Sequence, residues 1–263
     1  WFIHYKKNRK LTPKQDTMKG AFLGPKFSNN NVEEELNACN AIYKKFSEDD
    51  LIDTVANFLV EKKAIGWMQG RMEFGPRALG GRSIIADPRL PTMQKQLNLK
   101  IKYRESFRPF APSILSEYAR DWFEDEYESP YMLMVSKLKK NHRKMMTNKE
   151  KLLFGIDKLN IERSSVPAIT HVDYSARIQT VHYQTNPRFY SLLSKFNEKT
   201  GCPIIVNTSF NVRGEPIVCS PADAFKCFMS TDLDILCIED YILLKEEQND
   251  ALKINYTNKY DLD

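Results

Sequence analysis

The pattern of apolar and polar positions along the chain predicts strands and helices that alternate. Apolar residues recur at helical spacing between Val32 and Phe46, which predicts a first helix. Ser47, with Asp50 three positions later, forms a capping sequence for a second helix, and its apolar positions repeat every three or four residues. The apolar run at 64–68 then predicts a strand at 64–69. Alternation of this kind is typical of an α/β protein.

The same pattern places the other elements and the domain boundaries. Pro187 and the Ser-Pro pair at 220–221 mark helix starts, and Gly201 marks a helix end. Further helices are predicted at 91–102, 116–123, 187–200 and 221–230. Further strands are predicted at 83–86, 113–115, 131–135, 166–170, 177–182, 203–206, 233–238 and 241–245. Residues 1–30 are expected to be a basic linker, 31–250 one main domain, and 251–263 a polar tail.

The segment 70–83, GRMEFGPRALGGRS, directly follows the predicted strand 64–69 and is here called the glycine–arginine segment. Its glycines, among them Gly75 and Gly80, permit positive φ angles and a close approach of the backbone to a ligand. Its arginines carry a rigid, permanently charged fork that matches phosphate and carboxylate oxygens. A loop that combines both residue types at the end of a strand predicts an anion site.

Arginine is concentrated in this part of the chain. The 39 basic residues comprise 13 Arg and 26 Lys, yet six of the arginines fall between positions 71 and 108. Lysine is the usual surface cation, so a local preference for arginine indicates a need for its forked donor. Ion pairs with Glu73, Asp87 and Glu105 are the structural alternative, above all for the arginines at 71 and 89.

Composition limits the function classes only broadly. At 263 residues and 42% apolar, the chain is long enough for a sizeable core. The net charge of +5 owes much to the tract 137–151, which holds seven Lys or Arg and is expected to be a flexible insertion. The sequence has no run of 18 apolar residues and no signal peptide. Five cysteines without a CxxC pair predict reduced thiols in a cytoplasmic protein.

The N-terminal residues, WFIHY, are apolar and aromatic and lack an initiator Met. They resemble the cut end of an element, so the chain is expected to be a fragment. The four histidines are scattered along the sequence, which argues against a metal site built from Cys and His.

Four polar segments leave predicted strands or precede them, and loops at strand ends are where α/β proteins collect ligands. If these segments converge, they surround one pocket with positive charge and need a strongly anionic guest, either two phosphorylated compounds or one triphosphate. The sequence has neither a GxxxxGK[ST] nor a GxGxxG motif after a strand, so nucleotide binding must rely on side chains and loop amides. The cationic candidates are Arg77, Arg82, Lys102, Arg104, Arg108, Arg177 and Arg213, and the neutral donors are Asn207, Ser209 and Asn211.

Other chemistries have weaker support. Asp87, Asp173 and Glu215 are candidates to help hold Mg²⁺ or, alternatively, to orient arginines. Ser83 and Ser209 lack a neighbouring histidine and a GxSxG elbow, so covalent catalysis has little support. Alignment and charge neutralisation of a phosphoryl or acyl-phosphate group fit better.

The sequence GWMQGRMEFGPRALG at 66–80 closely resembles the signature of the O-carbamoyltransferases that decorate nodulation factors and antibiotics. Segments 104–112, 171–181 and 207–216 resemble the same family, and the likeness spans roughly residues 20 to 245. Gly81 departs from it, because the family usually has Asn at this position.

This resemblance implies a two-part enzyme. An N-terminal half, with an actin/Hsp70-like fold, binds a transition metal and performs the final transfer, and the expected linker 1–30 would be its remnant. The C-terminal half, similar to YrdC-type synthases of threonylcarbamoyl-adenylate, takes carbamoyl phosphate and ATP with Mg²⁺ and forms carbamoyl-adenylate. This chain matches only the C-terminal half, so the implied fold is a mixed twisted sheet flanked by helices, with no transition-metal site.

The resemblance also implies roles for individual residues. The catalytic set is Arg77, Lys102, Arg108 and Arg213. The substrate- and nucleotide-binding set is Arg82, Arg104, Arg177, Asn207, Ser209, Asn211, Gly75 and Gly80. Two alternatives stay open: a module that binds nucleotide or phosphate without turnover, and a YrdC-like RNA-binding module. The RNA-binding alternative has less support because the arginines lie in tight Gly/Pro loops rather than on an open face.

Overall fold

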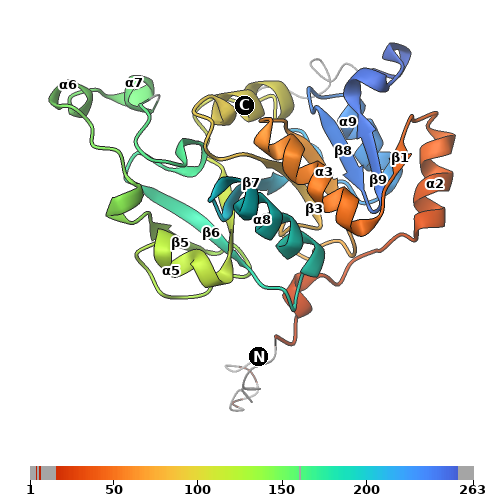
Figure 1. The fold of residues 1–263 in the computed structure, drawn as a ribbon, viewed down its shortest axis with the longest axis horizontal. Helices are drawn as coiled ribbons and strands as arrows, with labels where there is room; N and C mark the ends of the chain where they lie inside the picture. Colours follow the sequence, from red (N-terminus) through yellow and green to blue (C-terminus); the bar gives the residue numbers. More distant parts are fainter. Residues whose placement is uncertain (1–3, 5, 7–15, 160, 254–263) are drawn as a thin grey trace.

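The fold is a mixed α/β sheet with helices on both faces, as the sequence predicts (Figure 1). The computed structural model describes residues 4, 6, 16–159 and 161–253. Residues 1–3, 5 and 7–15 of the expected linker, 1–30, and residues 254–263 of the expected tail, 251–263, therefore lie outside the described residues. The described strands are β1 (Lys44–Lys45), β2 (Ile65–Met68), β3 (Arg82–Ala86), β4 (Ala111–Leu115), β5 (Met134–Lys137), β6 (Ser175–Val181), β7 (Ile204–Ser209), β8 (Ile235–Ile238) and β9 (Tyr241–Leu244).

These strands form one sheet in the order β1-β9-β8-β2-β3-β7-β4-β6-β5. The pairs β2–β8 and β4–β6 are parallel, and the other neighbouring pairs are antiparallel. Strand β7 lies between β3 and β4, so the segment after Asn207 is brought next to the glycine–arginine segment.

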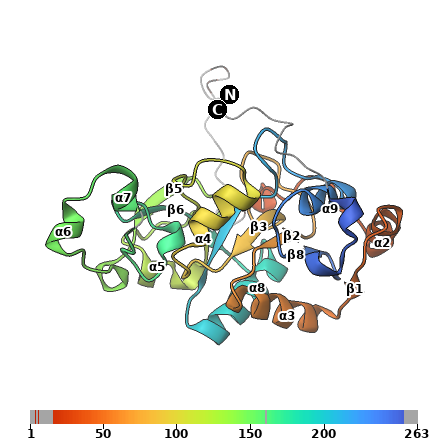
Figure 2. The ribbon, with the colours of Figure 1, turned by 90° about the horizontal axis from the view of Figure 1, so that it is seen from above.

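The helices cover both faces of the sheet. Helices α3 and α8 pack together on one face, whereas α4 and α9 lie on the other (Figure 2). Helices α6 and α7 project from the body of the molecule at the β5 side (Figure 1). The described helices are α2 (Asn29–Ala38), α3 (Glu48–Val60), α4 (Met93–Gln96), α5 (Ala119–Trp122), α6 (Asn148–Lys151), α7 (Gly155–Leu159), α8 (Pro187–Thr200) and α9 (Pro221–Met229).

The predicted helix boundaries rest on capping contacts that the structure confirms. The Ser47 side chain accepts a hydrogen bond from the Asp50 amide at the start of α3. Ser220 and Asp223 form a complete capping box at the start of α9. Gly201 ends α8 with φ +70°, a left-handed conformation that glycine adopts at little cost.

Some predicted elements are wrong in type or extent. The first helix ends at Ala38 rather than near Phe46, because Asn40 turns the chain with φ +54°. Residues 166–170 form a turn of 3-10 helix (Pro167–Ile169) rather than a strand, since proline has no N–H for a sheet ladder. The strand expected at 131–135 begins only at Met134, after a turn in which Met132 has φ +54°.

The stretch expected as one helix at 91–102 consists of α4 followed by a π-helical turn, Leu97–Ile101. The lysine-rich tract contains the end of β5, a 3-10 turn (Lys140–His142) and α6. His142 in this tract stacks on Trp122, with ring centroids 3.8 Å apart. The remaining short turns are 3-10 helices at Lys19–Ala21, Ser116–Tyr118, Lys245–Glu247 and Asp250–Leu252.

The core lies between the sheet and its helices and includes buried residues of β2, β3, β7 and β8. Trp67 of β2 is fully buried, and its indole N–H donates to the Gly80 carbonyl at 3.0 Å. This bond ties the glycine–arginine segment to the core. Among the described residues, no helix combines the length and the apolar character that a bilayer crossing requires.

Candidate functional site

A small pocket, here called the arginine pocket, lies where β7, β4, β6 and the glycine–arginine segment meet. Its volume is about 160 Å³. It brings together five of the residues that the sequence singles out, from four separate segments. Its lining is Pro76, Arg77, Ala78, Arg104, Pro109, Phe110, Ala111, Met132, Arg177, Asn207, Thr208 and Ser209.

The sheet register explains why these distant residues meet. Asn207 of β7 pairs with Ala111 of β4. Ser113, two residues along β4, pairs with Gln179 of β6. Because side chains two residues apart in a strand share a face, Arg177 and Gln179 lie on the same side of β6. The register therefore places Arg177, Ala111 and Asn207 at one level of the sheet.

Positive charge is concentrated in the arginine pocket. Burial and the nearby charge of Arg77 lower the pKa of Arg177. Burial and the charge of Arg108 lower the pKa of Arg104 to about 10. The Arg104 guanidinium donates to the Asn98 side-chain oxygen at 2.7 Å and lies over the Phe110 ring. Like charges held this close and partly out of water favour an anion between them.

Three buried polar atoms of the pocket residues have no hydrogen-bond partner. They are the Nε atoms of Arg77 and Arg177 and the Oδ1 atom of Asn207. Such atoms are costly unless a ligand satisfies them. Two are N–H donors and one is an acceptor, so the matching ligand offers both acceptors and a donor.

The orientation of the Asn207 amide follows from its neighbours. Its Nδ2 donates to the Ala78 carbonyl at 3.1 Å and to the side-chain oxygens of Ser113 and Gln179, both at 2.9 Å. Gln179 Nε2 in turn donates to the Leu79 carbonyl at 2.8 Å, which fixes Gln179 Oε1 as an acceptor. The Asn207 oxygen is therefore the atom that stays available.

Lys102 lies beside the pocket and holds one of its walls. The side chain is 4% exposed, and burial together with the Arg104 charge lowers its pKa to about 7. Its Nζ contacts the Ser209 carbonyl and the Asn211 carbonyl and side-chain oxygen, the latter two at 2.9 Å. Ser209 Oγ donates to Asn211 Oδ1 at 2.7 Å, so Lys102, Ser209 and Asn211 form one unit.

Arg82 does not line the arginine pocket. It is fully buried, and its guanidinium donates to backbone carbonyls rather than to open space. Three of these, of Gln69, Gly70 and Gly81, belong to the two ends of the glycine–arginine segment and its junction with β2. Arg82 thus joins the two ends of this loop, and its side chain has a structural role inside the protein. The other acceptors are the carbonyls of Pro25 and Cys219.

Glu73 organises the same loop from inside, a role that the sequence analysis missed. The side chain is 6% exposed, and its Oε1 accepts from the amides of Leu79, Gly81 and Arg82 at 2.6, 2.7 and 3.3 Å. The structural alternative for this residue, an ion pair at the surface, does not describe its contacts with these amides. The sequence around a single glutamate in a polar loop does not show whether its side chain binds buried loop amides or forms an ion pair at the surface.

Two ion pairs of the structural alternative do exist. Arg89 makes a forked contact with Asp87, with the shortest distance 2.7 Å. Arg108 pairs with Glu105 at 3.0 Å and does not line the arginine pocket. Arg213 and Asn211 also lie outside the pocket lining.

The two glycines predicted in the site differ in their surroundings. Gly80 has φ +102°, and a Cβ there would lie 2.3 Å from Phe189 Cδ1. Gly75 has φ +147°, with open space where a Cβ would point. At Gly81 a Cβ would lie 2.9 Å from the Arg71 carbonyl oxygen and 3.1 Å from Glu73 Oε2.

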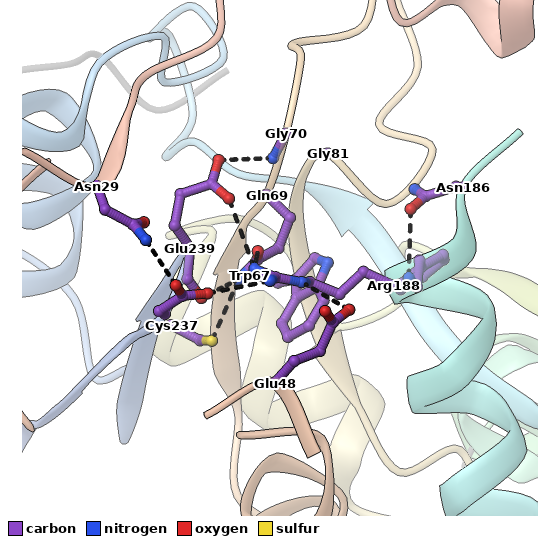
Figure 3. A network of polar contacts seen from close by, with 12 residues as sticks. Asn29, Glu48, Trp67, Gln69, Gly70, Gly81, Asn186, Arg188, Cys237 and Glu239 are labelled. Atoms are coloured by element: carbon purple, nitrogen blue, oxygen red, sulfur yellow. Dashed lines mark hydrogen bonds and ion pairs between the residues drawn. The ribbon is translucent and has the colours of Figure 1, made fainter. Parts of the chain in front are cut away.

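A second network, also missed, supports the first residue of the glycine–arginine segment (Figure 3). The Gly70 amide donates to Glu239 Oε1 at 2.8 Å. Arg188 donates to the Gln69 side chain at 2.8 Å and to Asp240 at 3.0 Å. Arg188 is one polar position in an amphipathic helix, so its pattern in the sequence resembles that of any surface arginine.

A larger cavity, of about 720 Å³, lies elsewhere and is lined in part by Lys245, Asp232 and Tyr103. None of its lining residues has a buried side-chain atom without a partner among the described residues. The described residues also contain no group of three His, Cys, Asp or Glu that could hold a metal ion. Asp87 contacts Arg89, and Asp173 accepts from the Ser175 amide and hydroxyl.

Comparison with known proteins gives relatives along most of the chain. An uncharacterized protein of Synechocystis sp. is 56% identical over 93% of this chain and 40% of its own length. Nodulation protein NolNO of Sinorhizobium fredii is 38% identical over 88% of this chain and 32% of its own. The 3'-hydroxymethylcephem-O-carbamoyltransferase of Amycolatopsis lactamdurans is 36% identical over 63% of this chain and 28% of its own. The chain thus spans less than half the length of these relatives.

Among solved structures, full-length HypF in its phosphate- and nucleotide-bound form aligns with a TM-score of 0.45 and 18% identity, over 77% of this chain and 22% of that one. The family model described as "Carbamoyltransferase C-terminus" matches residues 56–245, which include every residue of the arginine pocket. On this match, and on the likeness to NolNO, the chain belongs to the carbamoyltransferase C-terminal family.

Proposed function

We propose that this chain binds carbamoyl phosphate and ATP at the arginine pocket and joins them into carbamoyl-adenylate. A separate N-terminal half of a longer protein would then transfer the carbamoyl group to a hydroxyl acceptor. Family membership supports the general activity, carbamoyl transfer. The finer proposal depends on the chemistry of the pocket.

The observation that carries the proposal is the set of unsatisfied atoms. Arg77 Nε and Arg177 Nε need acceptors, and Asn207 Oδ1 needs a donor. Carbamoyl phosphate offers both, because it has phosphate oxygens at one end and an amide NH₂ at the other. An acyl phosphate without the amide nitrogen would satisfy the two arginines and leave the Asn207 oxygen without a partner.

The charge of the pocket agrees with this choice. The lowered pKa values of Arg104 and Arg177 mean that each guanidinium is held near another cation and partly away from water. A ligand with about two negative charges relieves both costs. The pocket volume, about 160 Å³, suits one small phosphorylated molecule.

The reaction needs alignment more than proton transfer. Water first hydrolyses carbamoyl phosphate, and the products are carbamate and inorganic phosphate. A carbamate oxygen then forms a bond to the α-phosphorus of ATP, and the bond from that phosphorus to pyrophosphate breaks. In this proposal Arg77, Arg104 and Arg177 hold the anions in line and neutralise charge on the departing groups. Mg²⁺ enters as the counterion of the nucleotide.

The wider residue assignment is also a proposal. Lys102 keeps Ser209 and Asn211 in place through its contacts with both. Arg108 and Arg213 would reach the ligands outside the pocket wall. Gly75 and Gly80 give the glycine–arginine segment its path around the anion.

The test is the release of pyrophosphate from ATP by the purified chain, with and without carbamoyl phosphate. We expect release only when carbamoyl phosphate is present. Acetyl phosphate, which has a methyl group where carbamoyl phosphate has the amide nitrogen, should bind about tenfold or more weakly, because it leaves the Asn207 oxygen unsatisfied. ATP binding without any release would instead favour the binding module without turnover.

A further inference from the structure

The arginine pocket is too small for the whole nucleotide that the proposed function requires, and the inference here rests on that function. Its volume is about 160 Å³, whereas pockets that enclose a drug-sized ligand measure roughly 300–1,000 Å³. A phosphorylated group fits inside. The base and ribose of a nucleoside triphosphate must therefore lie outside the pocket walls, against some other surface.

Two exposed phenylalanines stand next to those walls along the chain. Phe74 is 72% exposed and Phe107 is 49% exposed. Each comes two residues before a proline that lines the arginine pocket, Pro76 in one case and Pro109 in the other. A single exposed apolar side chain is ordinary. Two aromatic rings, one on each of two wall-forming loops, are a more specific arrangement.

The backbone that carries Phe74 is firmly held. The Phe74 amide donates to the Ala21 carbonyl at 2.7 Å, and the Met72 amide donates to the Pro25 carbonyl at 2.9 Å. These bonds tie the segment around Phe74 to the chain at 21–25. The ring is therefore presented to solvent from an ordered loop.

The backbone around Phe107 is held in the same way from another direction. The fully buried Asn98 donates through its side-chain nitrogen to the carbonyls of Ser106 and Arg108, at 3.1 and 2.8 Å. Gln94 donates to the Phe107 carbonyl itself at 3.3 Å. Fixed loops that expose their rings reduce the entropy that is lost when a ligand stacks on them.

We propose that Phe74 and Phe107 provide the contact surface for the base of the nucleoside triphosphate whose phosphates enter the arginine pocket. Aromatic side chains stack on the π-face of a base, and every base has such a face. The cationic pocket then binds the phosphates while the rings bind the base. Stacking does not read the edge of a base, so the two rings discriminate little between adenine and guanine.

The test compares two ligands that differ in the nucleoside alone. Binding of ATP and of inorganic tripolyphosphate to the purified whole chain is measured by calorimetry. We expect the native chain to bind both. Phe74→Ala and Phe107→Ala should each weaken ATP binding by about 5- to 150-fold, the range for loss of one base–aromatic stack. Tripolyphosphate binding should stay unchanged, and Phe74→Trp should restore ATP binding.

Phe154, which is 92% exposed and does not line the arginine pocket, provides the matched control. Phe154→Ala should bind both ligands as the native chain does. ATP binding that is unchanged in both Phe74→Ala and Phe107→Ala overturns the inference and leaves the proposed function intact. Equal loss of both ligands also overturns it, because the rings would then act on the anion site. A native chain that binds neither ligand overturns the proposed function itself.

Discussion

The guanidinium groups of Arg77 and Arg177 line one pocket although they come from distant parts of the chain, and the charge of Arg77 helps to lower the pKa of Arg177. Each has a buried Nε without a hydrogen-bond partner. Repulsion between the two cations and their unpaired Nε atoms both favour the binding of an anion. Their relationship gives the first prediction.

Arg77→Met and Arg177→Met should each weaken the binding of carbamoyl phosphate by about 10- to 150-fold, the range for loss of a charged hydrogen bond. Stability should change little or rise, because one of two like charges is removed. Calorimetry and urea unfolding measure the two effects. Arg120 is exposed and outside the arginine pocket, so Arg120→Met is the control and should bind normally. Binding that survives both pocket substitutions would contradict the site.

Lys102 predicts a pH dependence of stability. Burial lowers its pKa to about 7 in the folded chain, from about 10.5 in the unfolded chain. Between these values the unfolded chain binds more protons, so the free energy of unfolding should rise with pH from about 7 upward. The contribution reaches at most about 1.4 kcal/mol per pH unit.

Urea unfolding at pH 7 and pH 9 checks this prediction. Native protein should gain stability over this interval relative to Lys102→Met, which cannot titrate at this position. Comparing the two chains cancels the titration of other groups, among them Lys245, whose pKa is lowered to about 8. Equal changes in both chains would mean that Lys102 keeps an ordinary pKa.

Glu73 predicts a stability effect that a surface glutamate would not have. Glu73→Ala removes the acceptor of three buried amides and should destabilise the fold by about 3 kcal/mol or more. Glu73→Gln keeps an oxygen acceptor and should lose about half as much or less. Chemical denaturation measures both variants. Glu126→Ala, at an exposed position, should stay within about 0.5 kcal/mol of the native chain. A similar small change in Glu73→Ala would refute the capping role.

The sequence predicts the α/β class and most elements correctly because capping residues and apolar runs act locally. It fails where a single residue changes the course of the backbone: the first helix ends before Asn40, and Pro167 begins a 3-10 turn in place of a strand. For the pocket, it groups Arg77, Arg104, Arg177, Asn207 and Ser209, which do line one cavity, because each belongs to a polar segment at or next to a predicted strand. Arg82 looks the same in the sequence, and only the three-dimensional path of the loop turns its side chain inward.

Substitution by alanine should destabilise the fold more at Gly80 than at Gly75. Gly80→Ala combines a positive φ with a Cβ that would lie 2.3 Å from the Phe189 ring. Strain and overpacking together should lower the free energy of unfolding of Gly80→Ala by about 3 kcal/mol or more. Gly75→Ala meets open space, so only the strain of its φ remains, about 1–3 kcal/mol. Thermal melts of the two variants give the comparison, and a Gly75→Ala chain less stable than Gly80→Ala would contradict it.

Substitutions of Arg82 can distinguish a structural role inside the loop from direct contact with the ligand. Because its guanidinium donates to the carbonyls of Gln69, Gly70 and Gly81, Arg82→Met should leave buried acceptors without partners. We expect a loss of about 3–5 kcal/mol in the free energy of unfolding. Arg82→Lys should not restore it, since an ammonium group lacks the planar fork that reaches several carbonyls at once. Urea unfolding and carbamoyl phosphate binding are measured on the same variants, at a temperature where the folded form persists. A chain that keeps its native stability but loses the ligand would show that Arg82 contacts the ligand directly, and the joining of the two loop ends would then need another explanation.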